Sequence, residues 1–350
     1  MSSIQSGIIN LVEGNELSRY DTQQIIREIM QGHTSDSEIA SFLTALCIRG
    51  ETSEIIAGAA EIMREYASQI TPNTTEPLVD TCGTGGDNAN TFNISTLAAI
   101  VAAGAGVHIA KHGNRSISSK CGSADLLEAF GVKINLEPEE VKSIIEKIGI
   151  GFMFAPKFHP AMKYVMPVRR SLKMRTVFNI LGPLTNPANA KSHVLGVFNK
   201  ELIQPLAEVM NKLGANHVYI INSEPGIDEI IPYSEVHVGE VKEGEIEYYS
   251  LKPSDFGVNS FYMSELSGGT IEKNLEIAVK ILKNEDLGIK REIVLINAAF
   301  AVLSAYGDMT YDTAYEKVKE ALTTGKALKK LEELVRETQG SILKFNEVIQ

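Results

Sequence analysis

The sequence has few cysteines and no long hydrophobic run. Its three cysteines, Cys47, Cys82 and Cys121, are odd in number and widely spaced, so they predict neither a disulfide framework nor a paired-cysteine metal site. No apolar run is long enough to span a bilayer, and no basic region followed by an apolar core opens the chain. We therefore expect no signal peptide, no membrane partner and a reducing, cytoplasmic location.

Positive charge is also scarce. The chain has 33 Lys and Arg against 44 Asp and Glu, a net charge of −11. Nucleic-acid binders are usually basic, so we expect no nucleic-acid partner. The 350 residues are enough for one large domain or two, and contents of 44% hydrophobic and 22% charged residues are ordinary for a globular protein.

Carboxylates are missing from two long segments. Residues 88–124 and 147–200 contain no Asp or Glu, and the second segment carries nine Lys or Arg. Apolar strands and helices explain part of the first gap, because they carry few charges of either sign. They do not explain the crowding of basic side chains over 169–175. A local positive field for an anionic small molecule is the better interpretation.

A glycine-rich stretch, DTCGTGGD at 80–87, follows a short apolar strand and precedes a helix expected over 97–105. Strand, glycine loop and helix N-terminus together gather backbone N–H groups around an anion. Gly83, Gly85 and Gly86 allow the backbone to turn tightly and to approach a ligand closely. The carboxylate of Asp87 then suits ligand hydroxyls or a cation.

The chain divides near a Pro-bounded linker at 72–77. Before it, apolar residues recur at helical spacing in four segments, which predicts a small helical bundle without catalytic residues. After it, strands and helices alternate, including a βαβ unit over 193–222 and a hairpin over 236–251. A short strand is also expected at 132–134.

Three loops together indicate the chemistry. The glycine loop offers N–H donors, and the loop 111–120 adds an ammonium, an amide, a guanidinium and hydroxyls, which match a phosphate or pyrophosphate bearing a sugar. Asp228 and Glu229 are suitable for Mg²⁺, which binds one or two carboxylates together with substrate phosphates. Each feature alone is commonly structural or surface-exposed. Together, at successive strand ends, they favour a phosphorylated sugar or nucleotide handled with Mg²⁺.

Long motifs support a resemblance to a known family. DTCGTGGD, NIST at 93–96, KHGNRSISSKCGSADLLEAFG at 111–131, HPAMKYVMPVRRSLKMRTVFNILGPLTNP at 159–187 and the Asp228–Glu229 pair closely resemble the anthranilate phosphoribosyltransferase family of tryptophan biosynthesis. The resemblance runs from the N-terminal helices to about Ala301.

The resemblance implies an α/β fold of the nucleoside-phosphorylase-like kind. A small helical domain, 1–72, joined in space by about 170–190, would accompany a large α/β domain, 73–350, with a mainly parallel central sheet. The family acts as a homodimer through the helical domain. It transfers the phosphoribosyl group of phosphoribosyl pyrophosphate (PRPP) to the amino group of anthranilate, with Mg²⁺, and releases pyrophosphate.

Site residues follow from the same resemblance. PRPP would contact Gly83, Gly86, Asp87, Thr91, Asn93, Ile94, Ser95, Thr96, Lys111, His112, Gly113, Asn114, Arg115, Ser116, Ile117, Ser118, Ser119 and Ser123. Anthranilate would contact Gly83, His112, Asn114, His159 and Arg169, and Mg²⁺ would bind Ser95, Asp228 and Glu229. Lys111, Asn114 and Arg169 are the expected catalytic residues. His159 has a structural alternative, as a buried histidine with satisfied hydrogen bonds.

Two other functions stay open on the sequence. A pyrimidine nucleoside phosphorylase shares the fold class and phosphate loops, but it would take free phosphate and recognise uracil or thymine, whereas Asn114 and Arg169 suit a carboxylate better. A non-enzymatic nucleic-acid-binding relative would need a broad basic face, which the net charge of −11 disfavours.

Overall fold

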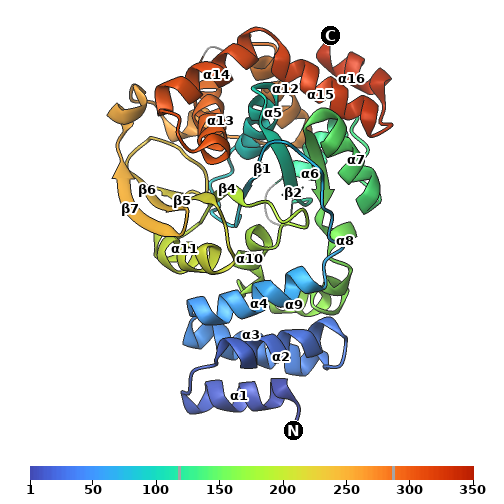
Figure 1. Cartoon of the computed structure of the whole chain (residues 1–350), viewed down its shortest axis with the longest axis vertical. Helices are drawn as coiled ribbons and strands as arrows, with labels where there is room; N and C mark the ends of the chain where they lie inside the picture. The colour runs from blue at the N-terminus through green and yellow to red at the C-terminus, as the bar shows by residue number, and fades with distance from the viewer. Residues whose placement is uncertain (117–119, 286–287) are drawn as a thin grey trace.

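The computed structural model describes residues 1–116, 120–285 and 288–350. Four helices stack at the N-terminal end of the molecule, and a central sheet with further helices forms the rest (Figure 1). The four are α1 (Ser3–Glu13), α2 (Arg19–Met30), α3 (Asp36–Arg49) and α4 (Ser53–Glu65). Each begins at a Ser or Thr whose hydroxyl accepts a backbone N–H of the first turn.

Residues far along the chain pack against these helices. Two short helices, α9 (Met166–Leu172) and α10 (Phe178–Leu181), contribute apolar side chains to the same hydrophobic core as α1–α4. The Arg64 guanidinium in α4 donates a hydrogen bond to the Leu184 carbonyl oxygen at 2.7 Å. The segment over 165–184 therefore links the N-terminal helices to the α/β part.

The sheet has seven strands in the order β3-β2-β1-β4-β5-β6-β7. Their bounds are β1 (Leu78–Gly83), β2 (His108–Gly113), β3 (Ile150–Phe154), β4 (Ser192–Gly196), β5 (His217–Ser223), β6 (Val236–Lys242) and β7 (Glu245–Leu251). The first five in this order are parallel, and β6 and β7 are antiparallel. The chain builds outward from β1 to β3 and then returns to β4 on the other side of β1. This reversal makes a switch point, where ligands bind in open α/β sheets.

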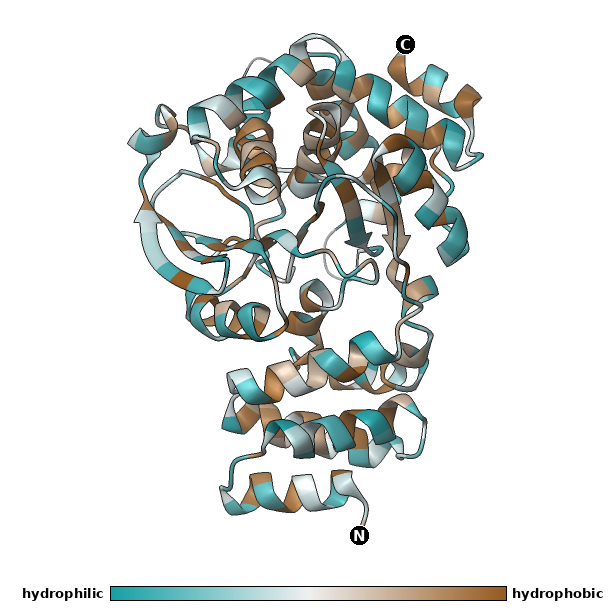
Figure 2. Ribbon diagram, viewed as in Figure 1, coloured by the Kyte–Doolittle hydropathy of each residue, from teal (hydrophilic) through white to brown (hydrophobic). Residues whose placement is uncertain are grey.

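Hydrophobic cores cover both faces of the sheet. Along β5, Val218 and Ile220 join the core shared with α1–α4 and α11 (Ile203–Lys212), whereas Tyr219 and Ile221 join the opposite core. Such alternation is expected of a strand buried on both faces. The second core is centred on α5 (Ile94–Gly104) and α13 (Ile289–Tyr306), which are coloured mostly apolar in Figure 2.

The remaining helices surround these cores. They are α6 (Ser123–Ala129), α7 (Pro138–Ile148), α8 (Ala155–Phe158), α12 (Ile271–Leu282), α14 (Tyr311–Thr323), α15 (Lys326–Glu337) and α16 (Ile342–Ile349), with 3₁₀ turns η1 (Pro160–Tyr164), η2 (Gly182–Leu184), η3 (Lys200–Leu202), η4 (Pro253–Phe256) and η5 (Met263–Leu266). Among the described residues, no single helix has both the length and the apolarity to cross a membrane. Of these residues, only α13 and α14 taken together are long and apolar enough to cross a membrane, and the pair is bent by 117° at the break between the two helices.

One expected element is wrong. Residues 132–134 do not form a strand, because their backbone is engaged elsewhere: Val132 N donates to the Leu127 carbonyl oxygen at 3.0 Å, and Lys133 N donates to Thr338 Oγ1 at 3.3 Å. The neighbour of β2 is instead β3. The expected hairpin is confirmed as β6 and β7, turned by Glu243 and Gly244 with φ of 50° and 90°.

Candidate functional site

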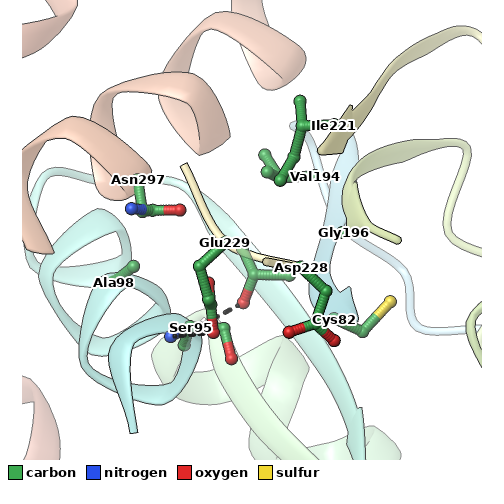
Figure 3. Close-up of a pocket in the computed structure, with 10 residues that line it drawn as sticks. Cys82, Ser95, Ala98, Val194, Gly196, Ile221, Asp228, Glu229 and Asn297 are labelled. Atoms are coloured by element: carbon green, nitrogen blue, oxygen red, sulfur yellow. Dashed lines mark hydrogen bonds between the residues drawn. The ribbon is translucent and has the colours of Figure 1, made fainter. Parts of the chain in front are cut away.

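Two glycines at the ends of β1 and β4 make room for the loop that follows β5. A Cβ atom on Gly196 would lie 1.6 Å from the Asp228 carbonyl oxygen, and one on Gly83 would lie 2.3 Å from Asp228 Oδ2. The register pairs Gly83 with Gly196, so both open the same edge of the sheet. The loop therefore crosses directly over the switch point, and Asp228 and Glu229 point toward α5 and β1 (Figure 3).

The two carboxylates accept hydrogen bonds from backbone N–H groups that we expected, from the sequence, to bind an anion. Asp228 Oδ2 accepts from Gly85 N in the glycine loop at 2.6 Å. Glu229 Oε1 accepts from Ser95 N at 3.1 Å, in the first turn of α5. Unsatisfied N–H groups and the helix dipole favour negative charge at such a terminus. Ser95, Asp228 and Glu229 are thus brought together, as expected.

Burial leaves this carboxylate pair electrostatically strained. It raises the pKa of Asp228 well above its usual range, and the charges of Asp87 and Glu229 raise it further. Burial also raises the pKa of Glu229 to about 7, although Lys111 opposes the change. A divalent cation would relieve both effects, because it neutralises closely spaced carboxylates.

The site suits a small hard cation. A cavity of about 10 Å³, room for roughly one water-sized atom, has the oxygen-bearing side chains of Ser95, Asp228 and Glu229 in its lining, beside apolar residues such as Ala98 and Val194. Carboxylate and hydroxyl oxygens are the donors that Mg²⁺ prefers. The side chains of Ser95, Asp228 and Glu229 therefore fit Mg²⁺.

Lys111 is buried beneath the glycine loop. Its ammonium donates to the Thr81 carbonyl oxygen at 2.5 Å, and only 4% of the residue is exposed. Burial lowers the pKa of Lys111, while Asp80 and Glu229 nearby counteract the change. The lysine therefore supplies fixed positive charge on the same side of β1 as the carboxylate pair.

A second group of residues lies at the end of β2, where the half-buried His112 and the buried His159 face each other. The ring centroids of His112 and His159 are 5.0 Å apart. Burial lowers the pKa of His112 to about 3 and that of His159 to about 4, so both are neutral at neutral pH. Within the described part of the chain, neither Nε2 atom has a hydrogen-bond partner. His159 is thus buried, with one ring nitrogen available to a ligand.

The loop after β2 is anchored to α6. The Asn114 carbonyl oxygen accepts from Ser123 Oγ and from the Ala124 N–H, both at 3.2 Å. Arg115 pairs with Asp125 at 2.9 Å and with Glu128 at 2.5 Å, so its guanidinium is directed to α6. A Cβ on Gly113 would lie 2.4 Å from Ser123 Oγ. Ser116 N donates to Asp125 Oδ2 at 3.2 Å, and Ile117, Ser118 and Ser119 lie outside the described residues.

The glycine loop is held from two sides. Asp87 Oδ1 accepts from Ala89 N at 3.1 Å, and Thr91 forms an antiparallel bridge with Ser267. Arg175 donates to the Gly86 carbonyl oxygen. Asn93 Nδ2 donates to the Cys121 carbonyl oxygen at 3.1 Å, and Ile94 and Thr96 are buried in α5. The expected PRPP residues of this region therefore surround the start of α5.

Arg169 lies in the last turn of α9, away from the carboxylate pair. Its guanidinium is 6.0 Å from the Phe178 ring centroid, and burial lowers its pKa. Among residues 1–116, 120–285 and 288–350, no carboxylate pairs with it. A half-buried guanidinium of this kind favours a carboxylate ligand.

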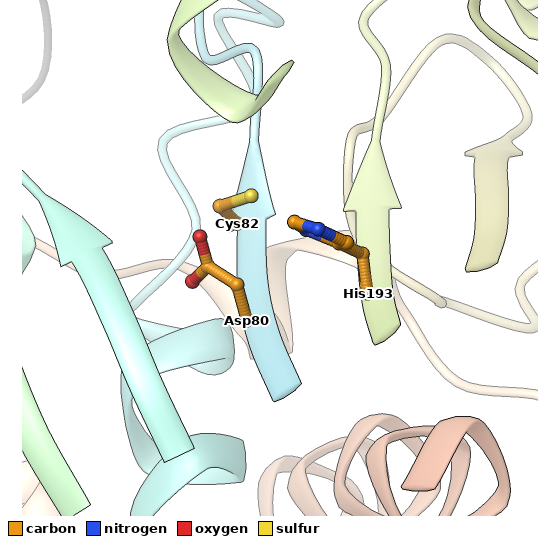
Figure 4. A group of neighbouring side chains, drawn as sticks. All are labelled: Asp80, Cys82 and His193. Carbon is orange, nitrogen blue, oxygen red and sulfur yellow. The ribbon is translucent and has the colours of Figure 1, made fainter. Parts of the chain in front are cut away.

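Asp80, Cys82 and His193 form a cluster within β1 and β4 (Figure 4). Asp80 accepts from His112 N at 3.1 Å and from Asn186 Nδ2 at 2.7 Å, and His193 Nε2 lies 2.8 Å from the Ala190 carbonyl oxygen. These bonds already engage both Asp80 oxygens. We therefore assign the cluster a structural role in joining β1, β2 and the segment around Asn186.

Sequence reasoning did not select Asn297 or Ser223, which hold the loop carrying Asp228 and Glu229. Asn297 had a visible signal, because it is the one polar residue in the apolar run 293–303 of α13. A buried polar side chain in such a run must find a hydrogen-bond partner.

Comparisons with known proteins agree with this geometry. Two family models match the chain: "Glycosyl transferase family, helical bundle domain" over residues 6–67, and "Glycosyl transferase family, a/b domain" over residues 75–328. An anthranilate phosphoribosyltransferase of Persephonella marina is 44% identical over 337 residues, covering 96% of this chain and 99% of the relative. One from Methanococcoides burtonii is 48% identical over 331 residues, covering 95% and 93%.

Solved structures are similar over nearly the whole chain. The anthranilate phosphoribosyltransferase of Thermus thermophilus superposes with a TM-score of 0.90 at 41% identity, covering 97% of this chain and 100% of that one. The enzyme of Saccharomyces cerevisiae, in complex with PRPP and Mg, gives a TM-score of 0.87 at 28% identity, covering 96% and 98%. A further structure of the yeast enzyme holds 4-fluoroanthranilate.

Proposed function

The chain belongs to the anthranilate phosphoribosyltransferase family, and we propose that the loops after β1, β2 and β5 carry out this family's reaction in it. The enzyme transfers the phosphoribosyl group of PRPP to the amino group of anthranilate, giving N-(5-phosphoribosyl)anthranilate and pyrophosphate, in tryptophan biosynthesis. The half-buried Asp228–Glu229 pair, set against Gly85 N and Ser95 N at the switch point, is the observation that carries the proposal.

Mg²⁺ would be held by Ser95, Asp228 and Glu229. When bound, it neutralises charge that develops on the departing pyrophosphate. The two carboxylates would exchange their N–H donors for the cation, which leaves Gly85 N and Ser95 N free to donate to PRPP phosphate oxygens. Asp87 would accept hydrogen bonds from ribose hydroxyls or add negative charge beside the cation.

The remaining donor contacts come from the glycine loop, the start of α5 and the loop after β2. Lys111 supplies a buried positive charge that stabilises the leaving group, and it needs no reorganisation because Thr81 already fixes its ammonium. Burial strengthens this effect, since the local dielectric is low.

Anthranilate would lie between Asn114, Arg169 and the two histidines. Arg169 would bind its carboxylate, because a guanidinium matches carboxylate geometry. The neutral imidazoles of His112 and His159 present Nε2 acceptors, which suit the N–H groups of an aromatic amine. His159 is therefore assigned to the anthranilate site rather than to structure alone.

Positioning carries most of the catalysis. Departure of pyrophosphate from C1 of the ribose builds oxocarbenium character, as in glycoside cleavage. The aromatic amine of anthranilate is already neutral, so its lone pair needs no strong base. Holding the amine next to C1 replaces a bimolecular encounter by a unimolecular step, which is worth large effective molarities.

A fluorescence assay tests the proposal. Anthranilate is fluorescent, so its signal should fall when PRPP and Mg²⁺ are added to the purified protein and should persist when either is omitted. Phosphorolysis of uridine or thymidine, measured in parallel, tests the nucleoside phosphorylase alternative. Stable anthranilate fluorescence at high protein concentration, together with nucleoside cleavage, would reject the proposal.

We also propose a homodimer formed through the N-terminal helices. Large apolar side chains are exposed on α1, α2 and α3: Ile9 by 42%, Val12 by 75%, Tyr20 by 66% and Ile48 by 78%. A second copy of the chain would cover them, because clustered exposed apolar side chains favour association. Light scattering after size exclusion should give twice the 38.2 kDa chain mass, and the Val12→Glu, Ile48→Glu variant should give a monomer. A wild-type monomer at micromolar concentration would contradict this.

We propose the cytoplasm as the location. Three widely spaced cysteines in 350 residues suit a reducing compartment. Subcellular fractionation tests this, and recovery with secreted proteins would contradict it.

A further inference from the structure

The loop after β5 is held by a side chain from a distant helix. Asn297 in α13 accepts a hydrogen bond from Ile230 N at 3.0 Å through Oδ1. Its Nδ2 donates to the Ile230 carbonyl oxygen and to the Ile293 carbonyl oxygen, both at 2.8 Å. The residue is 3% exposed, so these three bonds form in a desolvated environment where an unpaired group is costly.

Ser223 completes the attachment from the end of β5. Its hydroxyl donates to the Glu229 carbonyl oxygen at 2.7 Å and accepts from Ile231 N at 2.9 Å. The backbone directly after Asp228 is thus bonded by two buried side chains on two different elements. The bond from Ser223 is local, whereas the one from Asn297 ties the loop to the core helix α13.

The hydrogen bonds from Asn297 and Ser223 hold the loop in a position that repulsion between its two carboxylates disfavours. The carboxylates of Asp228 and Glu229 line the same small cavity, where two like charges repel each other. A free loop would relieve that repulsion by turning the carboxylates toward solvent. Asn297 resists this movement without adding charge, because its amide offers both a donor and an acceptor to Ile230 and its bond to Ile293 fixes which way it faces.

We propose that Asn297 is a positioning residue for magnesium binding: it fixes the Ile230 backbone and thereby keeps Asp228 and Glu229 at the switch point. The inference rests on the proposed function. Partners of metal ligands typically contribute 10- to 100-fold to metal affinity or activity, at the order-of-magnitude level. Loss of Asn297 should therefore raise the Mg²⁺ requirement and leave anthranilate recognition unchanged.

Asn297→Leu is the test variant, because leucine has the same number and branching of side-chain heavy atoms and forms no hydrogen bonds. Asn297→Asp is the second variant; it keeps size and one acceptor but loses the donor. Ser304→Ala is the matched control: Ser304 is buried in the same helix, and its hydroxyl donates to the His217 carbonyl oxygen at 3.1 Å, at the far end of β5. Thermal unfolding of all variants measures their general destabilisation.

Two readouts follow. Hydrogen–deuterium exchange of the segment 223–231, measured without metal, should be faster in both Asn297 variants than in Ser304→Ala. The half-saturating Mg²⁺ concentration for turnover should rise on the order of 10-fold or more, with kcat recovered at saturating Mg²⁺ and the anthranilate KM unchanged.

Two outcomes would contradict the role proposed for Asn297. Wild-type exchange and wild-type Mg²⁺ dependence in Asn297→Leu would overturn the inference. So would an equal loss of turnover at every Mg²⁺ concentration, because that result indicates general destabilisation. If the wild-type protein shows no Mg²⁺-dependent turnover with PRPP and anthranilate, the proposed function itself fails, while the exchange data still decide whether Asn297 holds the loop.

Discussion

Gly196→Ala is a severe perturbation that adds one methyl group. The alanine Cβ would lie 1.6 Å from the Asp228 carbonyl oxygen and 2.4 Å from its carbonyl carbon. Both atoms belong to the backbone, so no side-chain rotation relieves the overlap. The Asp228 backbone must move by roughly 1.5 Å to reach van der Waals contact. Gly196 does not have a positive φ, so alanine is compatible with the strand itself.

That displacement moves the carboxylates relative to Gly85 N and Ser95 N. A misplacement of about 1 Å can lower a rate about 100-fold, so we expect kcat/KM for anthranilate to fall by on the order of 100-fold or more. The fall should be largest at low Mg²⁺, because Asp228 and Glu229 are displaced together. The anthranilate fluorescence assay measures it, and circular dichroism checks that the fold is kept.

Gly325→Ala is the control. Gly325 has φ of 76° and an open surrounding, far from the site, so alanine should cost about 1–2 kcal/mol of stability through the left-handed backbone and leave kcat/KM unchanged. Activity of folded Gly196→Ala within about threefold of wild type would refute the proposed importance of this close approach, since a factor of three is less than 1 kcal/mol.

Three further predictions follow from the same site. Arg169→Ala should raise the anthranilate KM on the order of 10- to 100-fold, the value of a charge-assisted pair, and largely keep PRPP binding; equal loss for both substrates would contradict the division of roles. Asp228→Asn combined with Glu229→Gln should abolish Mg²⁺-dependent turnover, and unchanged steady-state rates would remove the pair from the site. Burial lowers the pKa of His112 to about 3 and of His159 and His193 to about 4, below the unfolded value of about 6.5, so the unfolded chain binds more protons and stability is lost as pH falls below that value. Each histidine should cost about 1.4 kcal/mol between about pH 7.5 and about pH 5.5, whereas the raised pKa values of Asp228 and Glu229 add stability over the same fall in pH. Denaturant titrations of the wild type and of His193→Gln therefore isolate the contribution of one histidine; an identical pH dependence of the two free energies of unfolding would contradict it.

Local patterns predicted most of the fold. Helix spacing and capping residues identified α1–α4, because those signals lie within each helix. The βαβ unit and the β6–β7 hairpin were also readable from adjacent residues. The segment 132–134 was wrongly predicted as a strand, because Lys133 N bonds to Thr338, which lies 205 positions away.

The candidate site likewise has features that local motifs predicted and features that only tertiary packing decides. Motifs and resemblance identified the carboxylate pair and the glycine loop, and the structure places Asp228 beside Gly85 and Glu229 beside Ser95. That Asp228 passes over Gly196 depends on the register of β1 and β4, which no local pattern encodes. The apolar run around Asn297 marks it as a buried polar residue, but its partner Ile230 lies 67 positions away and no local pattern identifies it. Sequence thus identifies groups able to react, whereas tertiary packing decides how they are held.

Product stoichiometry is the most direct test of the central claim. Purified protein incubated with PRPP, anthranilate and Mg²⁺ should consume anthranilate and release pyrophosphate in equal amounts, with a product of the mass of N-(5-phosphoribosyl)anthranilate. Removal of Mg²⁺ by a chelator should stop both processes. Pyrophosphate release without anthranilate consumption, or ribose 1-phosphate formation from a pyrimidine nucleoside and free phosphate, would contradict the account.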